Sequence, residues 1–309
     1  MSEINVVYGK VLSSDGKNNI YYKVYEPSCK RIGVLQVVHG MTEYIDRYDA
    51  FMRRAAEEGF LCFGHDHVGH GHTAPSDDEL GFIASENGDR VLVDDVGVVA
   101  NEVKAKYGFE KRILMGHSMG SFVVRMYSAE HSDELSAAIF MGTGGSNPAA
   151  GMGRAIAKAV KKSKGERYIS KTLDNMMFGS YNKKTENVTG RDWLTKDVEI
   201  QKKYDADKFC NYKFSVSAII DLLNLYIGAN SAEWYKSVKA DMPIYIVSGK
   251  DDPVGNYGKG PSEVYNKLIK SSHTSVTLRL WENDRHEILN ETDKDNVMEE
   301  LLKWAKKTI

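Results

Sequence analysis

The sequence predicts an α/β fold, with a mostly parallel central sheet, helices on both faces and an inserted helical cap. Short apolar runs alternate with helical patterns over residues 1–143, the alternation stops over residues 144–240, and it resumes over residues 241–309. Such alternation is typical of parallel strands joined by crossover helices. We therefore expect a core made of the first and last segments, with the middle segment as a cap over the end of the sheet.

The first core segment contains the clearest elements. Compact apolar or alternating runs predict strands, and apolar residues three and four positions apart predict helices. The predicted strands span residues 6–12, 21–25, 32–38, 60–63, 112–115 and 137–141. The predicted helices span residues 46–58, 90–106 and 121–129.

The rest of the chain is less regular until its last part. Within 144–240 only amphipathic stretches at 154–162 and 217–227 stand out as helical. The second core segment then predicts strands at 243–247 and 275–281, a helix at 262–270 and a last helix from about residue 294. No internal repeat interrupts this order.

Composition narrows the class of protein. The 309 residues are 42% hydrophobic and 27% charged, with a formal net charge of -2, which gives no electrostatic reason to expect a nucleic-acid partner. Cys29, Cys62 and Cys210 form no C-x-x-C pair and suit a reducing compartment. The chain shows no signal-peptide pattern and no apolar run long enough to span a bilayer, so we expect a cytoplasmic protein without a transmembrane segment.

Residues 116–120 read Gly-His-Ser-Met-Gly, between an expected strand and an expected helix. A serine at such a junction sits on a sharp turn, and the flanking glycines allow the strand and helix to approach each other. The pentapeptide alone occurs by chance in many proteins, but its context favours a nucleophile. We predict that Ser118 is an exposed nucleophile.

A serine hydroxyl needs a base, and the base needs an orienting carboxylate. On α/β hydrolases these follow the serine in the order acid, then histidine, each after a strand. His286 follows the strand that ends at 281, whereas His273 precedes that strand and is expected to be a surface loop residue. Asp251 and Asp252 both follow the strand that ends at 247, and we favour Asp252 because the proline after it restricts its backbone.

Acyl transfer also requires hydrogen-bond donors for the oxyanion. One is expected to be the backbone N–H of Met119, the residue after the nucleophile. The other is expected on the loop after an earlier strand, where His39-Gly40-Met41 stands, which makes the N–H of Met41 the second candidate.

Together these motifs resemble the monoacylglycerol lipase and lysophospholipase group of serine α/β-hydrolases, which is related to the serine aminopeptidase family. The resemblance rests on the segments 39–43, 65–73, 116–120, 249–255 and 285–287, and it spans nearly the whole core. It implies hydrolysis of a monoacyl lipid ester without a cofactor, and it also favours Asp252 as the acid. Ser121 departs from a glycine that is frequent in the family.

The resemblance further implies that the cap, 144–240, forms an apolar acyl tunnel. We also expect that transient contact with a membrane is possible through the cap. The same apolar pattern would equally serve to pack the cap on the core. The candidate substrate-binding residues are Met152, Ile156, Met176, Met177, Phe178, Phe214, Leu222, Leu223, Leu225 and Tyr226.

Several alternatives stay open from the sequence. Histidines 65, 67, 70 and 72 resemble a metal cluster, but glycine stands where a metallo-hydrolase has aspartate, so we expect no metal and structural hydrogen bonds for His65 and His67. A general carboxylesterase and a non-catalytic binding protein on the same fold are further readings. An aminopeptidase would need an acidic cap residue for the substrate ammonium. Glu166, Glu186 and Glu233 are candidates, each read more simply as a solvated charge.

Overall fold

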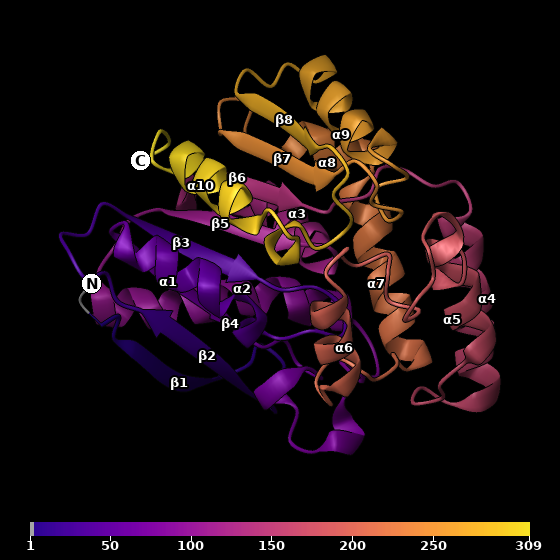
Figure 1. Ribbon diagram of the computed structural model, residues 1–309. Helices are drawn as coiled ribbons and strands as arrows, with labels where there is room; N and C mark the ends of the chain where they lie inside the picture. Colours follow the sequence, from indigo (N-terminus) through magenta and orange to yellow (C-terminus); the bar gives the residue numbers. More distant parts are fainter. Residues whose placement is uncertain (1–2) are drawn as a thin grey trace.

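The computed structural model describes residues 3–309 and contains a single eight-stranded sheet in the order β1-β2-β4-β3-β5-β6-β7-β8 (Figure 1). β1 is antiparallel to β2 and β2 to β4, while the other neighbouring pairs are parallel. The strands are β1 (Val6–Leu12), β2 (Asn19–Tyr25), β3 (Gly33–Val38), β4 (Phe60–His65), β5 (Arg112–His117), β6 (Leu135–Met141), β7 (Ile244–Gly249) and β8 (Val276–Trp281).

Helices cover both faces of this sheet. The core helices are α1 (Asp49–Glu57), α2 (Gly88–Tyr107), α3 (Met119–Glu130), α9 (Lys259–Lys270) and α10 (Lys294–Ala305). Buried residues of α1 and α10 pack with one set of strand residues, and those of α2, α3 and α9 pack with the alternate set. Because successive side chains of a strand point to opposite faces, this division places α1 and α10 on one face and the other three on the opposite face.

Five α-helices lie between β6 and β7, where the sequence predicts the cap. They are α4 (Ala150–Lys164), α5 (Lys171–Phe178), α6 (Val198–Ala206), α7 (Val216–Ala229) and α8 (Ala232–Ser237). Figure 1 shows α4 to α7 beyond the arrowheads of the parallel strands. Both α7 and α8 contact α3 of the core. The division of the chain at residues 143 and 240 stays a prediction.

The predicted elements differ from the observed ones mainly at their ends. β4 continues to His65 and β5 to His117, so each strand ends in a polar residue beyond the apolar run that predicts it. The helix expected at 46–58 begins with a 3₁₀ turn, Ile45–Tyr48, before α1. α5, α6 and α8 carry too few apolar residues at regular spacing to stand out in sequence. No helix within residues 3–309 is long and apolar enough to cross a membrane.

Candidate active site

Ser118 lies on the turn between β5 and α3, with a backbone φ of 53°. A Cβ at position 116 would lie 2.2 Å from the carbonyl oxygen of Gly120, and one at position 120 would lie 2.3 Å from that of Val38. Only glycine fits where backbones approach so closely, so the flanking glycines permit the turn. Ser118 itself is partly exposed, and its hydroxyl makes no hydrogen bond to another residue in 3–309.

His286 and Asp252 come from two loops at the same edge of the sheet. The Nδ1 of His286 lies 2.9 Å from Oδ2 of Asp252, and both side chains are buried. The other carboxylate oxygen of Asp252 accepts the N–H of Val254 at 2.8 Å, and the Ser248 hydroxyl donates to Oδ2 at 3.3 Å. Since a carboxylate only accepts, His286 carries a proton on Nδ1, which leaves Nε2 as the basic nitrogen.

The less favoured candidates for the acid and the base, Asp251 and His273, lie away from this pair. Asp251 is exposed, and no side-chain contact joins it to His286 among the described residues. His273 was expected on the surface, which is wrong: it is only 4% exposed, and its ring lies 3.2 Å from the carbonyl oxygen of Leu268 and 3.1 Å from that of Val238. It does lie at the opposite end of β8 from His286, as its place before the strand predicts.

The loop after β3 places Met41 beside Ser118. Met41 and Met119 both line the cavity that contains Ser118. Met119 is the first residue of α3, so its N–H has no partner within the helix, and the N–H of Met41 donates to no other residue in 3–309. The loop is held in an unusual form, because Thr42 has a φ of 51°, which is rare for a β-branched residue. Tyr204 of α6 hydrogen-bonds both the hydroxyl and the carbonyl oxygen of Thr42.

A buried group of histidines supports this loop. Nδ1 of His39 donates to the carbonyl oxygen of Gly40 at 2.8 Å, and its Nε2 accepts the N–H of His67 at 3.0 Å. His39 is therefore neutral, and burial lowers its pKa to about 3. The expectation for His65 is wrong, since neither of its ring nitrogens has a hydrogen-bond partner among residues 3–309. Nowhere in residues 3–309 do three His, Cys, Asp or Glu side chains gather in a way that could hold a metal ion.

A buried ionic network lies directly beneath Ser118 and His286. Glu43 accepts from the N–H of Gly40 at 2.5 Å and lies 2.9 Å from Nδ1 of His117, while Nε2 of His117 lies 3.2 Å from the carbonyl oxygen of His286. Arg47 lies 3.2 Å from Glu43 and makes a bidentate pair with Glu287. Both partners of His117 only accept, so His117 is an imidazolium. This network joins the three loops of the site.

The charges of this network stabilise one another. Burial lowers the pKa of His117, but the Glu43 carboxylate outweighs burial and leaves the pKa raised. Burial likewise raises the pKa of Glu43, but His117 and Arg47 reverse this and hold it well below its usual value. Removing one member of such a set leaves an uncompensated buried charge.

We expect Glu43→Gln to lower the free energy of unfolding by about 3–5 kcal/mol at pH 6, because it leaves buried cations without their partner. This decrease in the free energy of unfolding should become smaller as pH rises. The folded-state pKa of His117 is raised, so its stabilising effect is complete below about pH 6.5 and is lost as pH rises through the folded-state value. Urea unfolding from pH 5.5 to 9 measures this. Glu263→Gln, at a half-exposed pair with Lys267, is the control, and an unchanged loss across that pH range would contradict the assignment.

A cavity of about 960 Å³ opens onto this site between the core and the helices that follow β6. Its lining includes Ser118, His286, Met41 and Met119 together with many residues of the segment 144–240. The predicted apolar lining residues do line it, except Ile156, Phe214 and Leu225. Phe214 and Leu225 are buried in the core packing, and Ile156 is exposed on α4.

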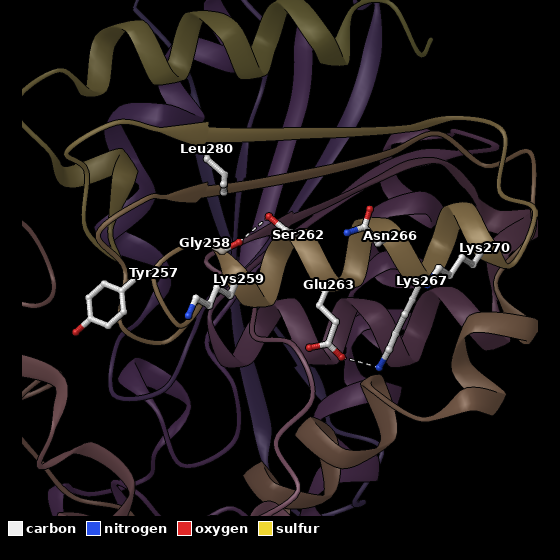
Figure 2. A pocket seen from close by; sticks show the side chains of 9 residues that line it. All are labelled: Tyr257, Gly258, Lys259, Ser262, Glu263, Asn266, Lys267, Lys270 and Leu280. Carbon is white, nitrogen blue, oxygen red and sulfur yellow. Dashed lines mark hydrogen bonds and ion pairs between the residues drawn. The ribbon is translucent and has the colours of Figure 1, made fainter.

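A second, shallower pocket of about 580 Å³ adjoins this cavity (Figure 2). It lies along α9, next to Leu280 of β8, and shares Lys259 and Glu263 with the cavity. Glu263 pairs with Lys267, and Ser262 donates to the carbonyl oxygen of Gly258, as Figure 2 shows. None of the predicted site residues lines this pocket.

Comparison with known proteins identifies the family. The family described as "Serine aminopeptidase, S33" matches residues 30–293. The chain belongs to this family. A monoacylglycerol lipase of Mycolicibacterium smegmatis is 25% identical over 293 residues, which cover 94% of this chain and 93% of the relative. The monoglyceride lipase of Rattus norvegicus is 23% identical, over 96% of this chain and 89% of the relative.

Solved structures of an esterase and a lipase are also similar to this chain. A thermostable carboxyl esterase from Bacillus coagulans, solved in complex with glycerol, has a TM-score of 0.92 at 28% identity and covers 99% of both chains. A monoglyceride lipase from Saccharomyces cerevisiae has a TM-score of 0.76 at 20% identity, covering 100% of this chain and 96% of that one, and so supports the fold. The expected α/β-hydrolase fold and the resemblance to monoacylglycerol lipases are confirmed. The protein is a hydrolase of the esterase and lipase type.

Sequence reasoning missed several residues near the site. Glu43 and Glu287 stand within the motifs 39–43 and 285–287, so their position beside a proposed catalytic residue was a signal for them. Arg47 lies four residues beyond Glu43 in the sequence and carried no such signal. Trp193, whose ring contacts His286, lies 93 residues from it in a stretch without regular pattern.

Proposed function

We propose that the protein hydrolyses carboxylic esters of monoacyl lipids, such as monoacylglycerols or lysophospholipids, through an acyl-enzyme. The observation that carries this proposal is the position of Ser118 and His286 on the wall of one cavity that apolar side chains of α5 and α7 also line. The relatives named above as monoacylglycerol or monoglyceride lipases support the same substrate class.

In this mechanism Ser118 attacks the ester carbonyl carbon while Nε2 of His286 takes the hydroxyl proton. The oxyanion is held by the N–H groups of Met41 and Met119, each worth about 3–4 kcal/mol in the transition state. His286 then gives its proton to the leaving alcohol, and water attacks the acyl-enzyme by the same route. Asp252 orients His286 and stabilises its imidazolium form. No step needs a cofactor.

The cap supplies the acyl site in this proposal. The cavity is also lined by Leu222 and Leu223 of α7 and by Met176, Met177 and Phe178 of α5. Burying each methylene of an acyl chain against such walls is worth about 0.8 kcal/mol. The cavity therefore favours a substrate with one long chain.

Exposed apolar side chains of α4 and α5 support a transient membrane contact. Met152 and Ile156 lie one turn apart on α4, and they are 63% and 38% exposed. Met176 of α5 is 57% exposed, and α4 ends in Lys161, Lys162 and Lys164. Exposed apolar side chains beside lysines are typical of helices that bind at a membrane surface. A cytoplasmic location stays a prediction, and the three free thiols suit it.

Aminopeptidase activity is the second candidate, favoured by the family's description. It requires a carboxylate free to bind a substrate ammonium. The acidic residues that line the cavity are all paired: Asp174 with Lys213, Glu263 with Lys267, and Glu43 and Glu287 within the buried network. Glu186 pairs with Arg285, and Glu166, Glu186 and Glu233 do not line the cavity. The charges therefore favour an ester substrate.

The test is a rate profile over nitrophenyl esters of increasing chain length, extended to monoacylglycerols and aminoacyl amides. We expect kcat/KM to rise several-fold with each added methylene until the cavity is filled. Leu223→Trp, which adds bulk to an apolar part of the cavity wall, should lower the rate on long esters and leave the acetate rate within about twofold. Cleavage of the amides alone would favour the peptidase, and a flat profile would favour a general carboxylesterase.

A further inference from the structure

The segment Asp192–Lys196, called the strap here, joins the cap to the loop that carries His286. The N–H of His286 donates to the carbonyl oxygen of Trp193 at 3.3 Å, and the N–H of Glu287 donates to that of Leu194 at 2.7 Å. These bonds attach the strap to the backbone of the proposed base itself. Asp192, Leu194 and Thr195 are buried.

Side chains tie the strap to the loop on both sides of His286. Arg285 donates to the carbonyl oxygen of Asp192 at 2.8 Å, and Lys196 lies 3.1 Å from the carboxylate of Asp284. Beyond His286, the hydroxyl of Thr195 donates to Glu291 at 3.0 Å. A segment 90 residues away in sequence therefore determines the path of this loop.

The indole of Trp193 also contacts the imidazole. The two ring centroids are 5.2 Å apart with an interplanar angle of 35°. The backbone N–H of Trp193 donates to Oδ1 of Asn182 at 2.9 Å, and the ring of Tyr181 packs on the indole at 4.9 Å. Trp193 is therefore held from the cap and presents its ring to His286.

Such a contact has a specific use, because the bond to Asp252 restrains only one nitrogen of His286. The ring can still swing about that bond and carry Nε2 away from Ser118. The ring of His117, with its centroid at 4.6 Å, limits this swing from the core side, and Trp193 limits it from the cap. Displacements of about 1 Å in a catalytic group cost as much as roughly 100-fold in rate.

We propose that Trp193 is a positioning residue, which holds the imidazole of His286 in line with Ser118. This rests on the proposed function, since it assigns His286 as the base. Trp193 lines the cavity as well, and Tyr181 and Phe178 continue the same row of rings along its wall. The cap thus serves both to bind the acyl chain and to orient the base.

The test compares Trp193→Leu and Trp193→Phe with the wild-type protein on a short and a long nitrophenyl ester. We expect Trp193→Leu to lower kcat roughly 10- to 100-fold on both esters with KM within about twofold, because the base is misplaced and binding is not. Trp193→Phe keeps a ring at this place and should recover most of kcat. Trp193→Gln repeats the test if the leucine variant is unstable.

Two further measurements distinguish a role of Trp193 in positioning His286 from a role in lining the cavity. Tyr226→Leu removes a ring that lines the cavity but packs on Phe122, and it should raise KM for the long ester and leave kcat nearly unchanged. In a double-mutant cycle, Trp193→Leu should cause no further loss of fluorophosphonate labelling once His286 is alanine. A raised KM with normal kcat in Trp193→Leu, or an undiminished loss in the alanine background, would overturn the proposal.

The wild-type protein distinguishes this inference from the proposed function. If wild-type protein neither reacts with a fluorophosphonate nor cleaves esters, the proposed function fails. If it does both and the Trp193 variants match it in kcat, only the positioning role fails.

Discussion

Replacing Ser118 with alanine is expected to lower ester turnover by about 10⁶-fold and to abolish covalent labelling by a fluorophosphonate. The hydroxyl oxygen is the only protein atom in the proposed mechanism that bonds to the acyl carbon. Ser118 is partly exposed in the cavity, so the probe can reach it, and the alanine side chain adds no bulk to the turn. Labelling is followed by intact-protein mass spectrometry and turnover by release of nitrophenol.

A matched control lies on the same helix. Ser128 of α3 is buried and donates to the carbonyl oxygen of Arg125, away from the cavity. Ser128→Ala should keep labelling and turnover within about twofold of wild type, since removal of one neutral hydrogen bond costs about 1 kcal/mol of stability. Persistent labelling of the Ser118→Ala protein would show that another residue is the nucleophile.

The second large effect on activity is expected from replacing Asp252, the proposed acid of the triad. Asp252→Asn is expected to lower kcat by about 10⁴-fold, because the amide presents the wrong hydrogen-bonding group to Nδ1 of His286 and no longer stabilises the imidazolium. Asp252 is fully buried and hydrogen-bonded to His286 at 2.9 Å. Steady-state kinetics on a nitrophenyl ester measure the loss.

Asp251→Asn is the paired control, since it makes the same chemical change one residue earlier on the same loop. Its side chain is exposed, so kcat should stay within about twofold of wild type. If instead only the Asp251 variant loses activity, the proposed acid is wrong.

Local pattern was enough to predict the turn at Ser118. A strand, a glycine-flanked serine and a helix are consecutive in sequence, and their steric needs are met within five residues. The order of Asp252 and His286 was also predictable, because parallel strands end at one edge of the sheet and their following loops meet there. The choice of Asp252 over Asp251 rested on the proline that follows it.

Contacts between residues that are far apart in the chain were not predicted from the sequence. His65 follows a buried strand pattern that does not indicate the surroundings of its ring nitrogens, and these have no hydrogen-bond partner in the part of the chain that the structure describes. His273 lies in a short polar stretch that resembles a surface turn, yet two backbone carbonyls from separate segments surround its ring. Trp193 reaches His286 only because the strap crosses back over the core.

The sequence by itself therefore determined the α/β class, the turn that exposes Ser118 and the loops of Asp252 and His286. These features depend on periodicity and on residues that are close along the chain. Only the tertiary structure decided how the charges of Glu43, Arg47, His117 and Glu287 are paired and which cap residues face the cavity. The reason is physical: burial and ion pairing depend on which distant segments pack together, and no local pattern records the strap that brings Trp193 to His286.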